Sequence, residues 1–543
     1  MGLDASEPRD PAEKAGVLRS GGVKQVSQQA QLCNPDARVT LERMELTSLL
    51  SSKAVAYQGV KTGDDPRYRR SHWELARITG CWRLYQSTVE KTSLFGGADS
   101  VLDWSDDGNA MARRQGLGAL GRAGAAVSQM QSLPCALYLG HLFDSNVAPV
   151  VPRDPSHLHA VWAFCSSAEY SRAVRRIDQK LNVANATLVK VPFNLVHWQA
   201  VADATYPNGL PEPHSNDPTQ WLFEGHPAGS TDPLQIAVAR LLGYRWPRQT
   251  DRWAEISRPP RATPRAAECG NSALTAESHT DNRLPVVPAT PADGLEPFAD
   301  PDGIVCLPAV GGEQPAEERL RSLLAAAFGQ DWSPGAQDRL LAEAGSPGKG
   351  LGEWLRDDFF TQHCKLFHNR PFIWHIWDGR KDGFSALVNY HTLDARKLDR
   401  LIYTVLGSWI VAMREATERG EAGADARLVA ALALQDKLKL IAQGDPPYDI
   451  YVRWKPLADQ PIGWNPDLND GVRLNIRPFV TAGVLRSKFS INWNKDRGTN
   501  PDGSVRLNDL HFTRAQKEAA RRERSREKGD GTLSACPGSP DLD

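Results

Sequence analysis

The sequence predicts a mixed α/β fold of the α+β type, built from two globular domains. Apolar residues make up 41% of its 543 positions, which is enough for two or three cores. Alternating stretches typical of strands occur beside stretches with helical apolar spacing. Residues 247–302 are rich in Pro, Ala, Arg and Thr with almost no aromatic residue, as in a linker. We therefore expect one domain on each side of this linker.

The first domain is predicted over residues 39–246, behind a disordered arm. Residues 1–38 are rich in Gly, Ser, Gln and charge, so they cannot bury enough apolar surface to offset the entropy of ordering. At the other end, TDPLQIAVARLLGYRWP predicts a helix with Thr231 as cap, Pro233 early and Gly243 as the stop. We expect this helix to close the first domain.

A strand, a helix and a strand are predicted inside the first domain. NVAPVVP (residues 146–152) and ATLVKVPF (residues 186–193) alternate as strands do. Between them, a helix from Glu169 to Lys180 is predicted to be amphipathic. Its polar face carries Arg172, Arg175, Arg176 and Gln179, and its apolar face carries Val174, Ile177 and Leu181.

The second domain, residues 303–513, is predicted to combine a hairpin with two long helices. The hairpin joins Phe372–Trp377 to Phe384–Tyr390 through DGRKDG, whose glycines suit a positive φ. The second long helix covers about residues 422–442. The first has a core-facing apolar stripe of Leu398, Leu401, Ile402, Val405, Leu406, Trp409 and Met413.

Residues 514–543 form a charged tail with a predicted helix, RAQKEAARRERSREKGDG. Mixed charges at this density are typical of a solvated face, and contact with phosphate is the alternative.

Composition narrows the classes of function. Lys and Arg number 64 against 65 Asp and Glu, so any affinity for nucleic acid has to come from local patches. No signal peptide and no apolar stretch of about 18 residues is present, so we expect a protein without a membrane segment. Cysteine spacing matches neither metal nor redox motifs, which indicates reduced thiols in the cytoplasm. The cysteines are Cys33, Cys81, Cys135, Cys165, Cys269, Cys306, Cys364 and Cys536.

The segment AYQGVKTGDDPRYRRSHWE, residues 56–74, carries a Gly-x-x-Thr-Gly-Asp turn. It resembles the turn that opens the DNA-reading domain of large adenine-specific DNA methyltransferases, including those of the BREX and DISARM phage-defence systems, which are related to type II restriction-modification methylases. Residues 128–225, 363–391 and 446–479 resemble later parts of the same proteins. The resemblance covers residues 39–520.

The resemblance implies a target-recognition half that binds double-stranded DNA. In the complete family enzyme, S-adenosylmethionine supplies the methyl group for the flipped adenine. The domain that binds this cofactor precedes the recognition region in the family, and we expect this chain to lack it. Methylation would then need a separate catalytic domain or subunit.

Three groups of residues are the candidate DNA-binding set. Basic side chains supply phosphate contacts, and glycines allow a close backbone approach. For the first group the alternative is a basic surface turn, and for the second a solvated amphipathic helix. The groups are Lys61, Thr62, Gly63, Arg67, Arg69 and Arg70; Arg172, Arg175, Arg176 and Lys180; and Arg453 and Lys455.

Aromatic residues interleave with the cations of the third group. Tyr448, Tyr451 and Trp454 alternate with Arg453 and Lys455, a pattern that suits stacking on an extruded base. An aromatic core beside a half-buried strand would show the same pattern, so both interpretations stay open.

Two further motifs suggest chemistry that their context does not support. Asp445-Pro446-Pro447-Tyr448 matches the motif with which amino-methyltransferases hold the target amine. The Gly-rich points at residues 94–99, 117–124 and 308–312 lack a strand before and a helix after in a βαβ repeat, so we find no cofactor cradle and interpret the motif as a turn. The group His363, Cys364, His368 and His375 fits no closed zinc site.

Three hypotheses follow. The first is the DNA-recognition part of a split or truncated adenine-specific methyltransferase. The second is an intact methyltransferase that uses Asp445 and Tyr448 with a diverged cofactor site. The third is a non-catalytic remnant or scaffold of a phage-defence complex.

Overall fold

The computed structural model describes residues 1–3, 5, 8, 10–32, 34–40, 48–78, 80–258, 287–487 and 511–530. The prediction of a mixed α/β fold is confirmed, because helices hold 44% of the residues and several small sheets hold 13%. The chain forms two compact units. Unit 1 comprises residues 1–69, 79–215 and 254–288, and unit 2 comprises residues 70–78, 216–253 and 289–543.

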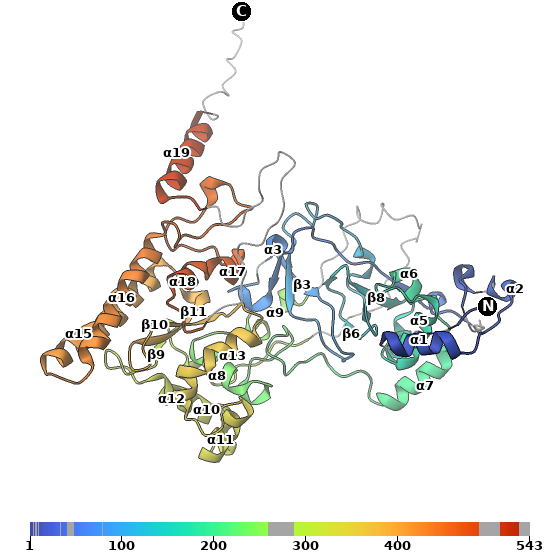
Figure 1. The fold of residues 1–543 in the computed structure, drawn as a ribbon, viewed down its shortest axis with the longest axis horizontal. Coiled ribbons are helices and arrows are strands. Elements are labelled where there is room, and N and C mark those ends of the chain that lie inside the picture. The colour runs from blue at the N-terminus through green and yellow to red at the C-terminus, as the bar shows by residue number, and fades with distance from the viewer. Residues whose placement is uncertain are drawn as a thin grey trace, which may run out of the picture. The chain divides into compact units, whose positions relative to one another are not determined.

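Unit 1 combines an antiparallel and a mixed sheet with short helices (Figure 1). Its main sheet has the order β1-β8-β5-β6, with Ala54 opposite Pro152 and Gly124 opposite Tyr138. The elements are α1 (Pro11–Ser20), α2 (Gln28–Gln31), β1 (Ala54–Ala56), α3 (Asp65–Tyr68), β3 (Trp82–Gln86), β4 (Ser100–Asp103), β5 (Gly124–Ser128), β6 (Cys135–Tyr138), β7 (Leu142–Phe143), β8 (Val147–Pro152), α4 (Leu158–Cys165), α5 (Ala168–Ile177), α6 (Asn185–Leu188) and α7 (Leu195–Thr205).

The chain first passes from unit 1 to unit 2 within β2 (Arg69–Ser71) and is back in unit 1 from residue 79. It enters unit 2 again at residue 216 and leaves it near α9 (Trp253–Ile256), before the last crossing at residue 289. Unit 2 contains α8 (Pro233–Leu241), β9 (Ile304–Cys306), α10 (Ala316–Phe328), α11 (Pro334–Glu343), α12 (Leu351–Asp357), α13 (Phe359–Leu366), β10 (Ile373–Trp377), β11 (Ser385–Asn389), α14 (Ala395–Asp399), a π-helical segment (Arg400–Val405), α15 (Leu406–Glu418), α16 (Ala424–Gln443), α17 (Val472–Asn475), α18 (Arg477–Ala482) and α19 (Arg514–Asp530).

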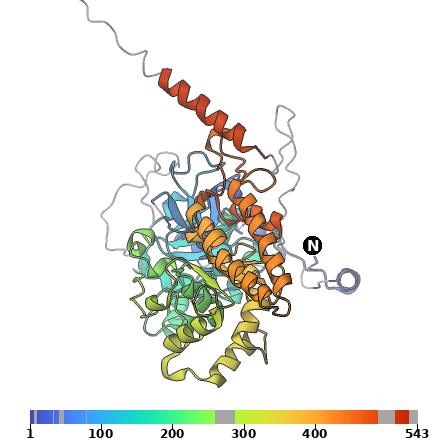
Figure 2. The ribbon, with the colours of Figure 1, turned by 90° about the vertical axis from the view of Figure 1, so that its left-hand side faces the viewer.

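The predicted hairpin and long helices of unit 2 are present. Strand β10 pairs antiparallel with β11, and Trp374 lies opposite Val388. α15 and α16 lie side by side (Figures 1 and 2). Of the predicted apolar stripe, Leu398 and Leu406 are buried, while Met413 is partly buried against the core. The period of the apolar residues therefore located these elements correctly.

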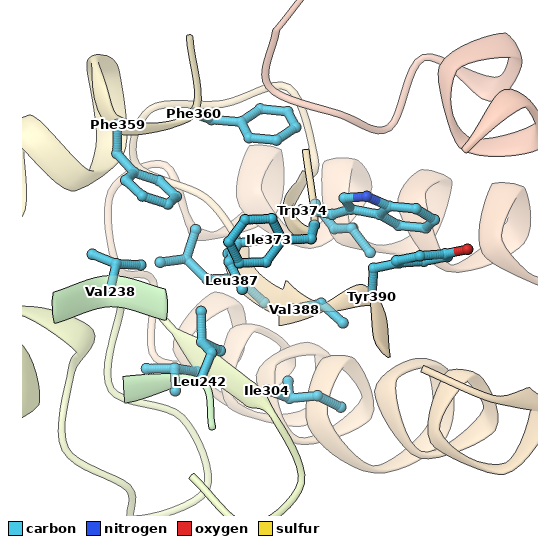
Figure 3. Close-up of a cluster of buried hydrophobic side chains, with 14 of the residues drawn as sticks. Val238, Leu242, Ile304, Phe359, Phe360, Ile373, Trp374, Leu387, Val388 and Tyr390 are labelled. Carbon is cyan, nitrogen blue, oxygen red and sulfur yellow. The ribbon is translucent and has the colours of Figure 1, made fainter. Parts of the chain in front are cut away.

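The helix expected to close the first domain belongs instead to the core of unit 2. α8 begins at Pro233 after Asp232, not after Thr231, and its residues are buried on every side. Val238 and Leu242 pack with Ile373 and Leu387 in the cluster of Figure 3. A helix buried on every side, with its polar Gln235 and Arg240 hydrogen-bonded inside the unit, belongs to a core, and the boundary between the units lies accordingly at about residue 216.

Part of the predicted linker also belongs to unit 2. Of residues 247–302, the structure describes 247–258 and 287–302. Leu295 is buried, and Asp293 pairs with Arg240 of α8. These anchored residues differ from a flexible linker, and the remaining ones lie outside the described ranges.

The second predicted strand of unit 1, residues 186–193, is a further correction. Its start forms the short helix α6, and its end makes an isolated bridge between Leu49 and Pro192. The carbonyls of Val189 and Val191 accept from the N–H groups of Ser51 and Leu50 at 2.7 and 2.9 Å, so the backbone of this segment bonds to a 3-10 turn and not to a neighbouring strand. The first predicted strand is present as β8.

The N-terminal arm and one of the Gly-rich points also differ from their predicted structure. Within residues 1–38, expected to be disordered, the structure describes α1, which buries none of its side chains. Residues 308–312 do follow a strand, β9, and precede a helix, α10, contrary to the expectation. However, β9 pairs antiparallel with β11, so no parallel βαβ unit arises there.

Candidate nucleic-acid interface

The turn that carries the family resemblance packs its backbone against the end of β7 in unit 1. The N–H of Val60 donates to the carbonyl of Phe143 at 2.9 Å. A Cβ on Gly59 would lie 2.0 Å from the carbonyl oxygen of Asp144, which real atoms cannot tolerate. Glycine is therefore required here by close backbone packing within the unit.

Side-chain and backbone bonds fix the tip of the turn. The hydroxyl of Thr62 donates to the carboxylate of Asp65 and accepts from the N–H of Asp64 at 3.2 Å. Gly63 has a φ of 78°, in the left-handed region that favours glycine. These contacts give Thr62 and Gly63 a structural role and hold the neighbouring Lys61 in place.

Lys61 lies opposite a basic residue that the sequence analysis did not single out. Lys61 and Arg113 form an isolated antiparallel bridge, in which the N–H of each donates to the carbonyl of the other at 3.0 Å. Both side chains are exposed. The adjacent arginines of the sequence ARRQG were the available signal, but the pairing depends on tertiary structure.

Of the arginines that follow the turn in unit 1, Arg67 is exposed and Arg69 is engaged. The Arg67 guanidinium lies 4.9 Å from the ring centre of Tyr68. Arg69 donates from Nε to Ser100 at 3.0 Å and from Nη2 to Ser87 at 2.7 Å. Its Nη1 donates to the carboxylate of Asp144 at 3.4 Å. Arg69 therefore binds other residues of unit 1 with all three nitrogens.

The predicted basic helix is α5, and its polar face is largely exposed. The side chain of Ser167 caps the helix by accepting from the N–H of Tyr170 at 3.1 Å. Tyr170, Val174 and Ile177 are buried. Leu181, expected on the same face, is 71% exposed because the helix ends at Ile177.

The four cations of this segment differ in their surroundings. Arg172, Arg176 and Lys180 are exposed. Arg175 donates to the carbonyls of Lys180 and Gln131, the latter at 2.5 Å, and burial lowers the pKa of its guanidinium. Arg175 therefore fastens the end of α5. Figure 1 shows α3, which follows the turn, and α5 in different parts of unit 1, so these cations do not form one continuous patch.

The remaining predicted cations lie in unit 2 and come together across a large sequence separation. Arg70 is 5% exposed, and its Nε donates to the carbonyl of Asn469 at 3.0 Å. The guanidinium groups of Arg70 and Arg453 lie 5.5 and 5.4 Å from the ring of Trp454. Trp454 is partly buried against the core. Its position therefore does not decide between stacking on an extruded base and a place in an aromatic core.

Lys455 is neutralised within unit 2. Its ammonium lies 2.7 Å from the carboxylate of Asp467 and 2.6 Å from that of Asp470. Burial opposes its charge, but the two acids raise the pKa of Lys455. Burial also raises the pKa of Asp470 to about 6. Two acidic side chains thus neutralise Lys455, whereas a cation that binds phosphate would be exposed and without such partners.

The Asp445–Tyr448 segment forms a turn that anchors the C-terminal helix. The N–H of Tyr448 donates to the carbonyl of Asp445 at 2.8 Å. The carboxylate of Asp445 accepts from the N–H of Arg514, at the start of α19, at 3.0 Å. This helix contact gives Asp445 a structural role.

The histidines of the second domain belong mainly to the core. His363 is fully buried, with Nδ1 3.2 Å from the Gln235 side chain, and Nε2 accepts from the N–H of Ile373 at 3.2 Å. Burial lowers the pKa of His363 to about 3. His375 contacts Ser385 through Nε2. In the described ranges, no three His, Cys, Asp or Glu side chains are grouped so that they could hold a metal ion.

Two further properties bear on the expected function. Among the described strands, β3 and β7 run parallel, but strands β4 to β6 connect them instead of a helix. These residues therefore contain no βαβ unit of the kind that cradles S-adenosylmethionine.

None of the helices in the described ranges has the combined length and apolarity that a bilayer crossing requires.

No protein-family model matches the chain, and the search of curated proteins likewise yields no match.

Proposed function

We propose that the chain is the DNA-binding, target-recognition part of an adenine-specific DNA methyltransferase of a restriction-modification or phage-defence system. The observation that carries this proposal is the exposed cationic surface of α5 and of the residues that follow it, within the region that resembles such enzymes. Arg172 and Lys180 are exposed, and neither forms an ion pair among the described residues. Cations that no acid neutralises are available to bind DNA phosphates.

Methylation, on this proposal, depends on a separate domain that binds S-adenosylmethionine. The support is the lack of a βαβ unit among the described residues. A cytoplasmic location is part of the proposal. Cys135, Cys165, Cys306 and Cys364 are buried free thiols, as expected in a reducing compartment.

The second hypothesis, an intact enzyme, has less support. Its candidate Asp445 already accepts a hydrogen bond from the backbone of α19. Calorimetric titration of the full chain with S-adenosylmethionine separates the two hypotheses. The recognition hypothesis expects no saturable binding, whereas micromolar binding by the folded chain would favour the intact enzyme.

DNA binding itself is tested by fluorescence anisotropy with a labelled duplex at several salt concentrations. Replacing both Arg172 and Lys180 by Gln should lower the magnitude of the log Kobs–log salt slope by about 1.8, at about 0.9 per phosphate contact. The matched control is Lys91→Gln, which removes an exposed cation elsewhere in unit 1. A wild-type chain that does not bind duplex DNA would refute the proposal and favour the scaffold hypothesis.

The choice of variants follows from the structure. Charge reversal at Arg69 or Arg70 would break hydrogen bonds inside the units, so a loss of DNA binding there would not identify a DNA contact. Arg172 and Lys180 avoid this difficulty because both side chains are exposed.

A further inference from the structure

We infer that Lys61 and Arg113 form a phosphate-binding pair that takes one backbone phosphodiester of duplex DNA. This inference rests on the proposed function and adds a site to it. Arg113 lies outside the segments that carry the family resemblance, and only the fold places it beside Lys61.

The geometry of the bridge brings the two side chains together. In an antiparallel pair that exchanges both N–H···O bonds, the side chains of opposite residues leave the same face, with Cβ atoms about 5 Å apart. Lys61 and Arg113 exchange both bonds at 3.0 Å. Val60 and Thr62, which flank Lys61, are buried, so the alternation of the strand directs Lys61 outward.

The charges of the pair are not neutralised by the described residues. Like charges directly opposite each other destabilise a strand pair. Neither Lys61 nor Arg113 forms an ion pair among the residues that the structure describes, and the nearby Asp65 is held by the hydroxyl of Thr62. An anion placed between the two cations would remove this repulsion.

A phosphodiester has the chemistry that this pair selects. The guanidinium of an arginine presents parallel N–H donors that match two phosphate oxygens, and a lysine supplies a mobile point charge. The backbone beneath is fixed by the close approach of Gly59 to Asp144 and by the left-handed Gly63. The backbone of the site is thus preorganised, and a contact to phosphate should not depend on DNA sequence.

The test compares Lys61→Gln, Arg113→Gln and the double variant with the wild-type full chain. Dissociation constants are measured on two duplexes of unrelated sequence over a range of salt concentration. Because the pair takes one phosphate, the double variant should lower the magnitude of the salt slope by about 0.9, and each single variant should lower it by less. The reduction in the salt slope should be equal on both duplexes. Lys91→Gln is the control and should leave the slope unchanged.

The conservative variant Arg113→Lys keeps the charge and should retain the slope. Because both side chains are exposed and each Gln removes one of two repelling charges, the thermal unfolding temperature should not fall in any variant. An unchanged slope in the double variant, with a reduced slope for the Arg172 and Lys180 variant, would overturn this inference while the proposed function stands. A loss confined to one duplex would indicate base recognition and also overturn it. Failure of the wild-type chain to bind DNA would overturn both.

Discussion

Removing the carboxylate of Asp293 should destabilise unit 2 by about 3–5 kcal/mol. Its two oxygens lie 2.6 and 2.8 Å from the guanidinium nitrogens of Arg240, which is 3% exposed. Burial opposes the ionisation of Asp293, but Arg240 holds the pKa of this carboxyl below its usual value, so the pair is charged at neutral pH. Among the described residues, Asp293→Ala leaves the buried guanidinium with only the partly exposed Glu296, 3.7 Å away, as a counter-ion, and breaking a buried pair in this way costs about that amount.

Urea unfolding measures this change. If the free energy of unfolding falls by about 3 kcal/mol per molar urea, the urea concentration at the unfolding midpoint of unit 2 should fall by about 1–2 M. Hydrogen exchange of the peptide covering α8 reports on the same unit, because Arg240 lies in that helix. The effect should persist at high salt, since buried pairs are screened less than exposed ones.

Glu296→Ala is the matched control for Asp293→Ala. Glu296 is 34% exposed and lies 3.7 Å from Arg240, so its loss should cost less than about 1 kcal/mol. The double variant Arg240→Met and Asp293→Ala should lose less free energy of unfolding than the two single variants together, because no buried charge remains unpaired. If Asp293→Ala shifts the midpoint no further than Glu296→Ala does, residues 287–302 are not anchored and the linker interpretation regains support.

Three further outcomes are expected. Burial lowers the pKa of His363 and His375 to about 3, below the value of about 6.5 for an unfolded histidine. Unit 2 should therefore keep its full stability above about pH 6.5, and its free energy of unfolding should fall by about 1.4 kcal/mol per pH unit for each histidine as the pH falls towards 3. Urea midpoints at pH 7.5 and 5.5 measure this loss. Midpoints that do not change would contradict the neutral, buried state of these rings. Lys517→Met should lower the free energy of unfolding by up to about 3 kcal/mol and speed hydrogen exchange in α19, since it leaves Asp449, which is 1% exposed, with only His511 as a partner in the described ranges. Protection equal to wild type would show that the Lys517–Asp449 pair does not hold the helix. Asp445→Ala should cost about 1 kcal/mol through the lost contact at the start of α19 and leave DNA affinity unchanged in anisotropy titrations, whereas a loss of DNA affinity would revive a functional role for the motif.

Local elements could be predicted because their signals are contained in short stretches. The apolar spacing in residues 398–413 and the glycines between β10 and β11 both reflect contacts formed within or between neighbouring segments. The strand predicted over residues 186–193 was wrong, because its first residues form α6 and its later carbonyls bond to the turn at Leu50 and Ser51, which are more than a hundred positions away.

The domain boundary could not be predicted in this way. The helix α8 has good local start signals, but those signals do not reveal which core the helix enters. That choice depends on Ile373 and Leu387, which are more than a hundred positions away in the sequence. Low aromatic content likewise suggested a linker at residues 287–302, where a buried ion pair anchors the chain.

The sequence by itself determined the mixed α/β class, most of the regular elements and the set of cations from which a DNA interface could be built. Tertiary structure alone decided which of those cations are available. Arg69 is occupied by residues from other strands, and Arg70 by the carbonyl of Asn469, 399 positions away. Lys61 gains Arg113 as a neighbour through one backbone bridge. The physical reason is that charge is a property of a residue, whereas its neutralisation or exposure depends on groups that only folding brings within a few ångströms.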